Sequence, residues 1–185
     1  MLRAAKMKLR YQVGLELAQK VVTALRPGCA RVEIAGSIRR KKVLIGDLEI
    51  VAIPLQTDLF GNHSLTMTGL DVVLAELVQA GKLAVPTRDG PRYKQFGVVS
   101  CPGLWLDLFL CEPQRWGVTY TLRTGSANFS RKAVTPRWRG GYLPKGFKVE
   151  GGRIIDSNDD LIETPEESDV FEVLTCGWIS PEKRR

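Results

Sequence analysis

The chain has 185 residues and carries 27 Lys and Arg against 20 Asp and Glu, a formal net charge of +7. This length suits one domain or a domain with a small lobe, and the charge favours a polyanionic partner such as nucleic acid. The basic, amphipathic start lacks the apolar core of a secretion signal and no apolar run approaches membrane-spanning length, so we expect an intracellular protein, not secreted and without a membrane partner.

The first elements read as a helix followed by two strands. Val13, Leu17, Val21 and Leu25 recur at every fourth position beside Ala18 and Val22, which predicts a core-facing helix that the RPG sequence at 26–28 ends. The segments RVEIA (31–35) and GDLEIVAIP (46–54) then read as strands, joined by a GSIRRKK turn.

A second helix and two further strands follow. LDVVLAELVQAGK (70–82) is amphipathic and stops at Gly81, and RYKQFGVVS (92–100) and LWLDLFLC (104–111) read as strands separated by a Cys-Pro-Gly turn. We therefore expect about four strands and two helices before residue 115. His63, in the polar stretch FGNHSL, reads as a surface residue.

The last third of the chain has its own pattern. TGSANFSRKAV (124–134) reads as a helix start, and FKVEGGRII (147–155) reads as a hairpin that turns at two glycines. In ETPEESDVFEVL, the spacing predicts a helix with Thr164 as N-cap, Pro165 at the first helical position and Glu167 in a capping box.

The element order predicts an α+β fold in two parts. We expect a mixed sheet flanked by helices in residues 1–120, and a small carboxy-terminal α/β lobe with a hairpin in residues 121–185. The cysteines are widely scattered, so we expect reduced, mostly buried thiols instead of a zinc site.

Three carboxylates stand out against the apolar strands. Asp47 and Glu49 are two residues apart, so they project from one face of GDLEIVAIP, and Asp107 interrupts the apolar strand LWLDLFLC. If the two strands are neighbours, the three carboxylates converge. Oxygen ligands of this kind suit two Mg²⁺ ions, or Mn²⁺, which would assist in-line phosphoryl transfer.

The GSIRR stretch has the properties of a phosphate-binding turn. Gly36 lets backbone N–H groups approach a ligand, Ser37 donates a hydroxyl, and the guanidinium groups of Arg39 and Arg40 pair with phosphate oxygens. A triphosphate held here would lie beside the carboxylates.

The order of these motifs resembles a known family. GSxRR, then GDxE ten residues after the Ser, a lone strand Asp and TGS is similar to the nucleotidyltransferase palm of family X DNA polymerases, the polymerase beta-like group. The resemblance covers about residues 13 to 185, including the tail ETPEESDVFEVLTCGWISPEKR. Such a palm with one terminal lobe is similar to the minimal viral members.

The resemblance implies a role for each matching position. Asp47 and Glu49 would hold both metal ions, and Asp107 would hold the catalytic ion and help to deprotonate the primer 3′-hydroxyl. The residues that would bind the incoming nucleotide are Gly36, Ser37, Arg39, Arg40, Gly46, Arg123, Thr124, Gly125, Ser126 and Ser130.

Three positions depart from the family pattern. Glu49 stands where Asp is usual, so its carboxylate would meet a metal ion in a different geometry. This favours Mn²⁺, which tolerates more varied coordination. Leu122 and Arg123 replace an aromatic residue that helps to exclude ribonucleotides, so we expect weak discrimination between dNTPs and NTPs. Ser130 replaces an Asn, so that base or minor-groove contact is lost or passes to Asn128.

The DNA contacts are expected on basic side chains of both parts. Only about thirty residues precede the first palm strand, too few for the lyase domain and the duplex-binding region of larger family members. We therefore expect no lyase activity and a monomer that grips DNA with the palm and lobe alone. The candidate DNA-binding residues are Lys41, Lys42, Lys94, Arg131 and Lys132. Further candidates for phosphate contacts are Lys6, Lys8, Arg10, Arg137, Arg139, Lys145 and Lys148.

The sequence therefore predicts a DNA polymerase that fills gaps in repair by two-metal-ion catalysis. One alternative keeps the chemistry but acts without a template on RNA ends, a protein or a small molecule. Another is a nucleic-acid-binding protein with a decayed active site, although every expected carboxylate is present.

Overall fold

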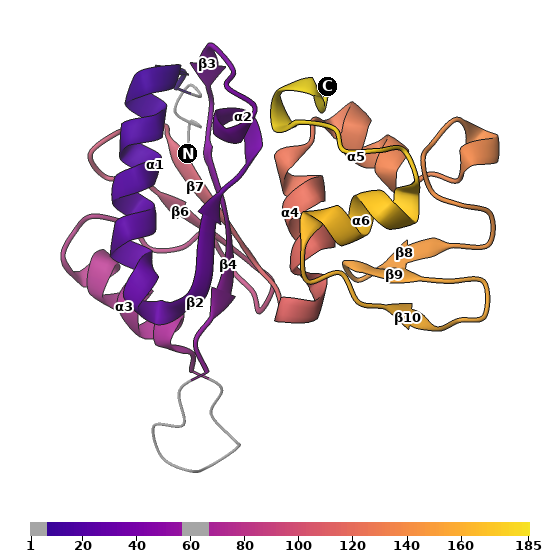
Figure 1. Cartoon of the computed structure of the whole chain (residues 1–185). Coiled ribbons are helices and arrows are strands. Elements are labelled where there is room, and N and C mark those ends of the chain that lie inside the picture. The colour runs from indigo at the N-terminus through magenta and orange to yellow at the C-terminus, as the bar shows by residue number, and fades with distance from the viewer. Residues whose placement is uncertain (1–6, 57–66) are drawn as a thin grey trace.

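The computed structural model describes residues 7–56 and 67–185 and has a mixed α+β architecture in two lobes (Figure 1). The amino-terminal lobe contains a five-stranded sheet in the order β2-β4-β7-β6-β5. In that order the strands are Cys29–Ile34, Leu48–Pro54, Trp105–Leu110, Tyr93–Gly97 and Arg88–Asp89. β4 runs parallel to β7 and the other pairs are antiparallel, so the predicted mixed sheet is confirmed, with β5 in addition.

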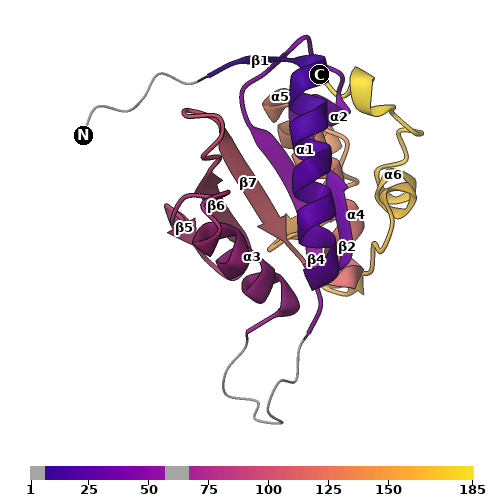
Figure 2. The ribbon, with the colours of Figure 1, turned by 90° about the vertical axis from the view of Figure 1, so that its left-hand side faces the viewer.

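Helices α1 (Tyr11–Leu25) and α3 (Gly69–Gln79) cover one face of this sheet (Figure 2). The buried stripe of α1 is Gly14, Ala18, Val22 and Leu25. The predicted core-facing helix is confirmed, with Ala18, Val22 and Leu25 buried as expected, but Val13 is 47% exposed and Gly14 lies on the buried face in its place. Gly14 lies there because the packing is close: a Cβ on Gly14 would lie 2.9 Å from Cγ1 of Ile45.

Short elements surround the sheet. The GSIRRKK stretch was predicted as a turn, but it begins with a one-turn helix, α2 (Gly36–Arg39). β1 (Leu9–Arg10) pairs with β3 (Leu44–Ile45) in a separate two-stranded ladder. Four 3₁₀ turns are present in the described residues: η1 (Arg26–Gly28), η2 (Pro113–Arg115), η3 (Arg137–Arg139) and η4 (Pro181–Lys183).

The carboxy-terminal lobe packs three helices beside a small antiparallel sheet (Figure 1). The helices are α4 (Trp116–Thr124), α5 (Ala127–Ala133) and α6 (Glu167–Leu174). The sheet order is β10-β9-β8, with bounds Leu161–Ile162, Arg153–Ile155 and Lys148–Glu150. The predicted hairpin is β8 and β9, and its turn glycines Gly151 and Gly152 both have positive φ.

Helix α4, which the sequence did not predict, joins the two lobes. Its residues Trp116 and Tyr120 pack with Val51 on the sheet face opposite α1 and α3. Its residue Val118 belongs instead to the core of the carboxy-terminal lobe, with Phe171 of α6. The boundary expected between residues 120 and 121 falls inside this helix.

Helix α6 begins two residues later than predicted. Its N-cap is Glu166, and Asp169 completes the capping box, so the assignment of Thr164 as N-cap is wrong. Thr164 is fully buried and remains extended because its N–H donates to the carbonyl of Gln114 and its carbonyl accepts from Gly117. These backbone bonds hold the segment against α4 before the helix can start.

The remaining expectations concern the cysteines, membrane-spanning helices, and the residues Lys6 and His63. The four cysteines are free, but only Cys29 is buried, so the expectation of mostly buried thiols is wrong for the other three. In the described ranges, no helix has the length and apolar character needed to cross a membrane. Lys6 and His63 lie outside the described residues.

Candidate active site

The three predicted carboxylates lie at the start of the two parallel strands. Asp47 directly precedes β4, and Glu49 of β4 pairs in register with Asp107 of β7. Paired residues of neighbouring strands project from the same face, which here is the face that carries α4. The condition that the two strands be neighbours is therefore met.

Glu49 occupies an environment that disfavours its charge. Burial, with the charges of Asp47 and Asp107, raises the pKa of this carboxyl to about 7, against the opposing effects of Arg40 and the Ser37 backbone. Gly36 lies against the Glu49 side chain, since a Cβ at that glycine would be 1.8 Å from Oε2. The carboxyl is thus turned toward the start of α2.

Asp107 is held by two residues that the sequence did not identify. The hydroxyl of Tyr93 donates to Oδ1 of Asp107 at 2.6 Å, and Nε2 of Gln95 donates to the same oxygen at 2.8 Å. Both donors lie on β6, where Gln95 is in register with Asp107. Alternating polar residues in YKQFG were the available signal, but their partner depends on which strand lies beside β6.

Carboxylate oxygens are ligands that suit Mg²⁺. The negative charges of Asp47 and Asp107 repel the Glu49 carboxylate, and a bound cation would offset this repulsion. In the part of the chain that the structure describes, however, no three His, Cys, Asp or Glu side chains are grouped so that they could hold a metal ion. Glu49 faces the α2 turn and Asp107 faces β6. The acids fit such an ion in kind, but they are not assembled as a ligand set.

The GSIRR turn lies beside the acids. Gly36 has φ +60°, a conformation that favours glycine, and opens α2. The hydroxyl of Ser37 is buried and has no hydrogen-bond partner within the described residues. Gly46 lies between β3 and β4, just before Asp47.

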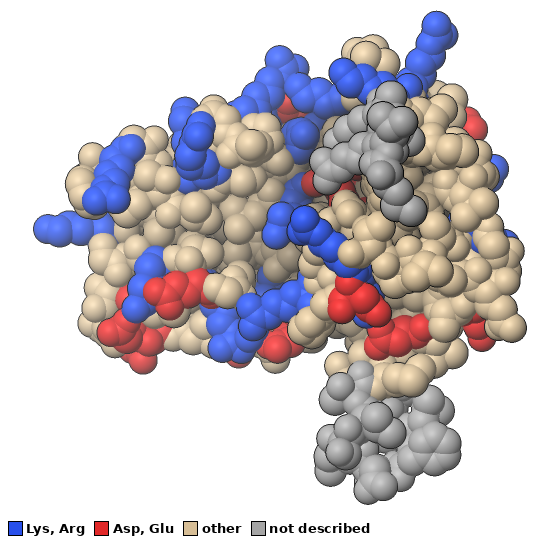
Figure 3. All heavy atoms as spheres, turned by 180° about the vertical axis from the view of Figure 1, so that it is seen from behind, with Lys and Arg blue, Asp and Glu red and all other residues tan. Residues whose placement is uncertain are grey.

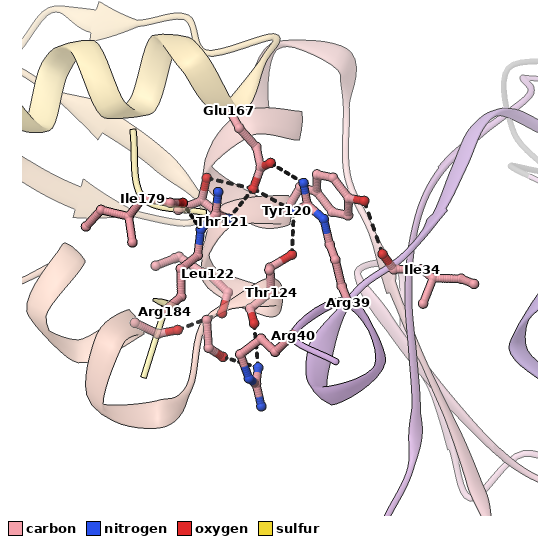
Figure 4. A network of polar contacts seen from close by, with 12 residues as sticks. Ile34, Arg39, Arg40, Tyr120, Thr121, Leu122, Thr124, Glu167, Ile179 and Arg184 are labelled. Atoms are coloured by element: carbon pink, nitrogen blue, oxygen red, sulfur yellow. Dashed lines mark hydrogen bonds and ion pairs between the residues drawn. The ribbon is translucent and has the colours of Figure 1, made fainter. Parts of the chain in front are cut away.

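Arg39 is bound inside a buried ionic network instead of pointing freely into the site (Figure 4). Its guanidinium donates to both carboxylate oxygens of Glu167, at 2.8 and 2.5 Å, and to Oγ1 of Thr124 at 2.7 Å. Arg184, which is fully buried, donates to Glu167 from the other side at 2.5 Å. Although burial favours the neutral acid, the hydrogen bonds from Arg39 and Arg184 lower the pKa of Glu167 overall.

Arg40 bridges α2 to the end of α4. It donates to the carbonyls of Thr124 and Gly125, the latter at 2.8 Å, while its Nε is buried without a partner among the described residues. Burial lowers the pKa of Arg40, and the charges of Glu49 and Asp47 oppose that effect. The guanidinium therefore lies within electrostatic reach of the acids.

The TGS segment forms the joint between α4 and α5. Ser126 caps α5 by accepting a hydrogen bond from the N–H of Phe129 at 3.1 Å. Gly125 is required because a Cβ there would lie 2.4 Å from Cδ1 of Phe129. The Ser130 hydroxyl donates to the carbonyl of Leu122 at 2.6 Å, so it is engaged within the lobe.

A groove of about 870 Å³ opens between the sheet and the carboxy-terminal lobe. Arg123 lines it with its guanidinium 3.9 Å from the ring centre of Phe109, which lies two residues after Asp107 on the same strand face. Burial lowers the pKa of Arg123, whereas the charges of Glu49, Tyr93 and Asp107 raise it. Arg123 is therefore close to the acids, as a nucleotide contact requires.

The predicted DNA-binding cations fall into two groups. Lys94 lines the groove but is paired with Asp71 and Asp89, and Lys41 is paired with Glu182 at 2.8 Å. Arg131 and Lys132 are exposed on α5, and Lys42 is partly exposed in the turn after α2. Two of the five predicted residues are therefore engaged in ion pairs within the protein, and three are exposed or partly exposed.

Comparison with known proteins adds no assignment. No protein-family model matches the chain, and no curated protein matches it. The arrangement of the acids and the α2 turn is therefore the basis for assigning a function. The groove is lined by Arg123 and Phe109, but the three acids are not among its lining residues.

Proposed function

We propose that this protein is a nucleotidyltransferase with the palm of family X DNA polymerases, which adds nucleoside monophosphates to a DNA 3′-hydroxyl in gap-filling repair. The observation that carries the proposal is the placement of Glu49 directly beside Asp107 on parallel strands. Asp47 directly precedes β4, the strand of Glu49, and the Gly36–Ser37 turn contacts the Glu49 side chain. An acid cluster adjoining a phosphate-sized backbone turn is what nucleotidyl transfer requires.

The side chains divide the work of the reaction. Arg40 and the α2 turn would bind the β and γ phosphates of the nucleotide. The Ser37 hydroxyl in that turn has no hydrogen-bond partner among residues 7–56 and 67–185. The primer 3′-oxygen would attack the α-phosphorus, the bond to pyrophosphate would break, and the hydroxyl proton would pass to Asp107. Tyr93 and Gln95 would fix the orientation of that carboxylate through their hydrogen bonds.

Asp47, Glu49 and Asp107 would hold Mg²⁺ or Mn²⁺, which would supply the positive charge that offsets the negative charge of the triphosphate. The Glu49 carboxylate would have to turn away from the start of α2 to do so, while Tyr93 and Gln95 keep their bonds to Oδ1 of Asp107. The longer side chain of Glu49 can then favour Mn²⁺, since an additional methylene displaces its carboxylate by roughly 1.5 Å relative to Asp.

The test is extension of a labelled primer on single-stranded, primed and one-nucleotide-gapped DNA, with dNTPs or NTPs and with Mg²⁺ or Mn²⁺. We expect templated extension, comparable use of both sugars and at least a thousandfold loss in Asp107→Asn. Glu33→Gln, which removes an exposed carboxylate from the neighbouring β2, is the matched control and should retain activity.

Each other outcome has a definite meaning. Absence of extension on every substrate would refute the polymerase assignment. Untemplated addition to single-stranded ends would assign the template-independent alternative, and full activity of Asp107→Asn would remove Asp107 from the reaction. Strong preference for dNTPs would contradict the weak sugar discrimination expected from Leu122 and Arg123.

A further inference from the structure

An exposed tryptophan surrounded by cations stands at the far end of the carboxy-terminal lobe. Trp138 is 70% exposed and lies in η3 between two arginines. A hollow of about 530 Å³ beside it is lined by Arg137, Trp138 and Lys145. The guanidinium of Arg139 lies 4.3 Å from the centre of the Trp138 ring. An aromatic ring of this size is usually buried, so its exposure indicates a contact surface.

The structure holds this ring in its exposed position. Arg137, the residue before it, donates to the carbonyl of Leu174 at 2.7 Å and to the carbonyl of Tyr142 at 3.2 Å. Gly140, at φ +81°, closes the turn with a backbone bond back to Arg137 at 2.9 Å. The ring is therefore presented by a braced turn at the end of α6, which reduces the entropy lost when a ligand stacks on it.

The charge of the surrounding segment selects the kind of ligand. No Asp or Glu occurs between Glu112 and Glu150, while Lys and Arg recur throughout that stretch. In Figure 3, Lys and Arg side chains stand out on the upper part of this lobe and Asp and Glu gather at its lower edge. Trp and Arg also occur at protein interfaces, but a long run of sequence with cations and no acid matches the charge of a polyanion, and an exposed ring among those cations offers a base a surface to stack on.

We propose that Trp138, Arg139 and Lys145 form a binding site for single-stranded nucleic acid, with an unpaired base stacked on Trp138 and phosphates bound by the two cations. The site lies beyond the carboxyl end of α5, a helix of about 10 Å whose N-cap, Ser126, follows Gly125, the residue whose carbonyl binds Arg40. The exposed Arg131 and Lys132 lie on α5 between the two sites. An unpaired template strand leaving the active site would follow this path.

The role of this site as a path for the template strand rests on the proposed function. The binding test needs neither metal nor nucleotide, so the binding site and the proposed function can fail separately. Fluorescence anisotropy with a labelled oligothymidine should show that Trp138→Ala weakens binding by about fivefold or more, and that Trp138→Phe retains most of the affinity. Binding to a blunt duplex, which offers no unpaired base, should be unchanged. The oligonucleotide should also quench wild-type tryptophan fluorescence more than that of Trp138→Phe.

Matched variants separate stacking from charge and from folding. Val85→Ala, at a valine that is 74% exposed, and Lys20→Gln, on the exposed side of α1, should leave binding unchanged. Replacing Arg139 and Lys145 with Gln should reduce the slope of log affinity against log salt by about 0.7 for each cation lost. Circular dichroism checks that each variant is folded.

Two results would overturn the site. Equal single-strand affinity of Trp138→Ala and the wild type would show that no base stacks there. Self-association of the wild type in sedimentation, abolished by Trp138→Ala while single-strand affinity persists, would assign the surface to protein contact instead.

Discussion

Glu49 illustrates how much a single residue depends on its surroundings. The sequence placed it on a strand face with Asp47, and the structure adds Asp107 in register and Gly36 against its carboxyl. Burial and these like charges together raise the pKa of Glu49 to about 7. In the protein without metal, this carboxyl therefore binds a proton more readily when the chain is folded than when it is unfolded.

The pH dependence of stability follows from that shift. A raised folded-state pKa contributes stability below the ordinary pKa of Glu, and that stability is lost as pH rises toward about 7. We expect Glu49→Gln to exceed the wild type in free energy of unfolding by about 1 to 3 kcal/mol at pH 8, and to equal it near pH 4.

Urea unfolding in EDTA at both pH values would check this expectation. Glu33→Gln controls for the removal of a carboxylate on the adjacent strand. Equal stability of Glu49→Gln and the wild type at pH 8 would contradict the raised pKa.

At the scale of elements, one buried network ties three segments together. Glu167 at the start of α6 binds Arg39 of α2 and Arg184 just after η4 (Figure 4). The neighbouring Glu166 forms an ion pair with Arg31 of β2. Both side chains of this pair are more exposed than those of Glu167 and Arg184. The two adjacent glutamates therefore offer a comparison of a buried and an exposed ion pair in one protein.

We expect Glu167→Gln to lower the free energy of unfolding by about 3 to 5 kcal/mol, because it leaves the buried Arg184 without a counter-charge. Glu166→Gln, the matched control, should cost less than about 1 kcal/mol. Chemical denaturation measures both. A similar small cost for the two variants would mean that water reaches Arg184 readily.

The contact between α4 and the segment before α6 gives a second prediction at this scale. A Cβ on Gly117 would lie 2.1 Å from the carbonyl oxygen of Glu166 and 2.7 Å from that of Thr164, both backbone atoms. Gly117→Ala should therefore destabilise the protein by about 1 to 3 kcal/mol or more. In Gly97→Ala the nearest atom is Cβ of Ala84 at 3.4 Å, so this control should change the melting temperature little.

At the scale of the whole molecule, the shared helix α4 couples the lobes. Its face with Trp116 packs on the sheet, and its face with Val118 packs in the carboxy-terminal core. We expect a single cooperative transition in calorimetry, and a loss of about 3 to 5 kcal/mol in Trp116→Ala, whose side chain is fully buried. Two separate transitions in the wild type would show that the lobes unfold independently.

The elements with strong periodic patterns were the ones that the sequence identified. The helices α1 and α3, the strands β4, β6 and β7 and the β8–β9 hairpin follow from apolar spacing and turn residues, which act locally. Helix α4 was missed because Trp116 and Tyr120 face one lobe and Val118 the other, so its apolar residues form no single stripe. The N-cap of α6 was misplaced because backbone bonds to α4 keep Thr164 extended.

By itself, the sequence determined the chemistry that the chain has available: three acids on strands, a Gly-Ser turn with two arginines, and a basic surface. Only the tertiary structure decided how these groups are used. Arg39 and Arg184 both donate to Glu167, Tyr93 and Gln95 hold Asp107, and Trp138 is left exposed. The physical reason is that backbone propensities act over a few residues, whereas burial and charge pairing depend on which distant segments the fold brings into contact.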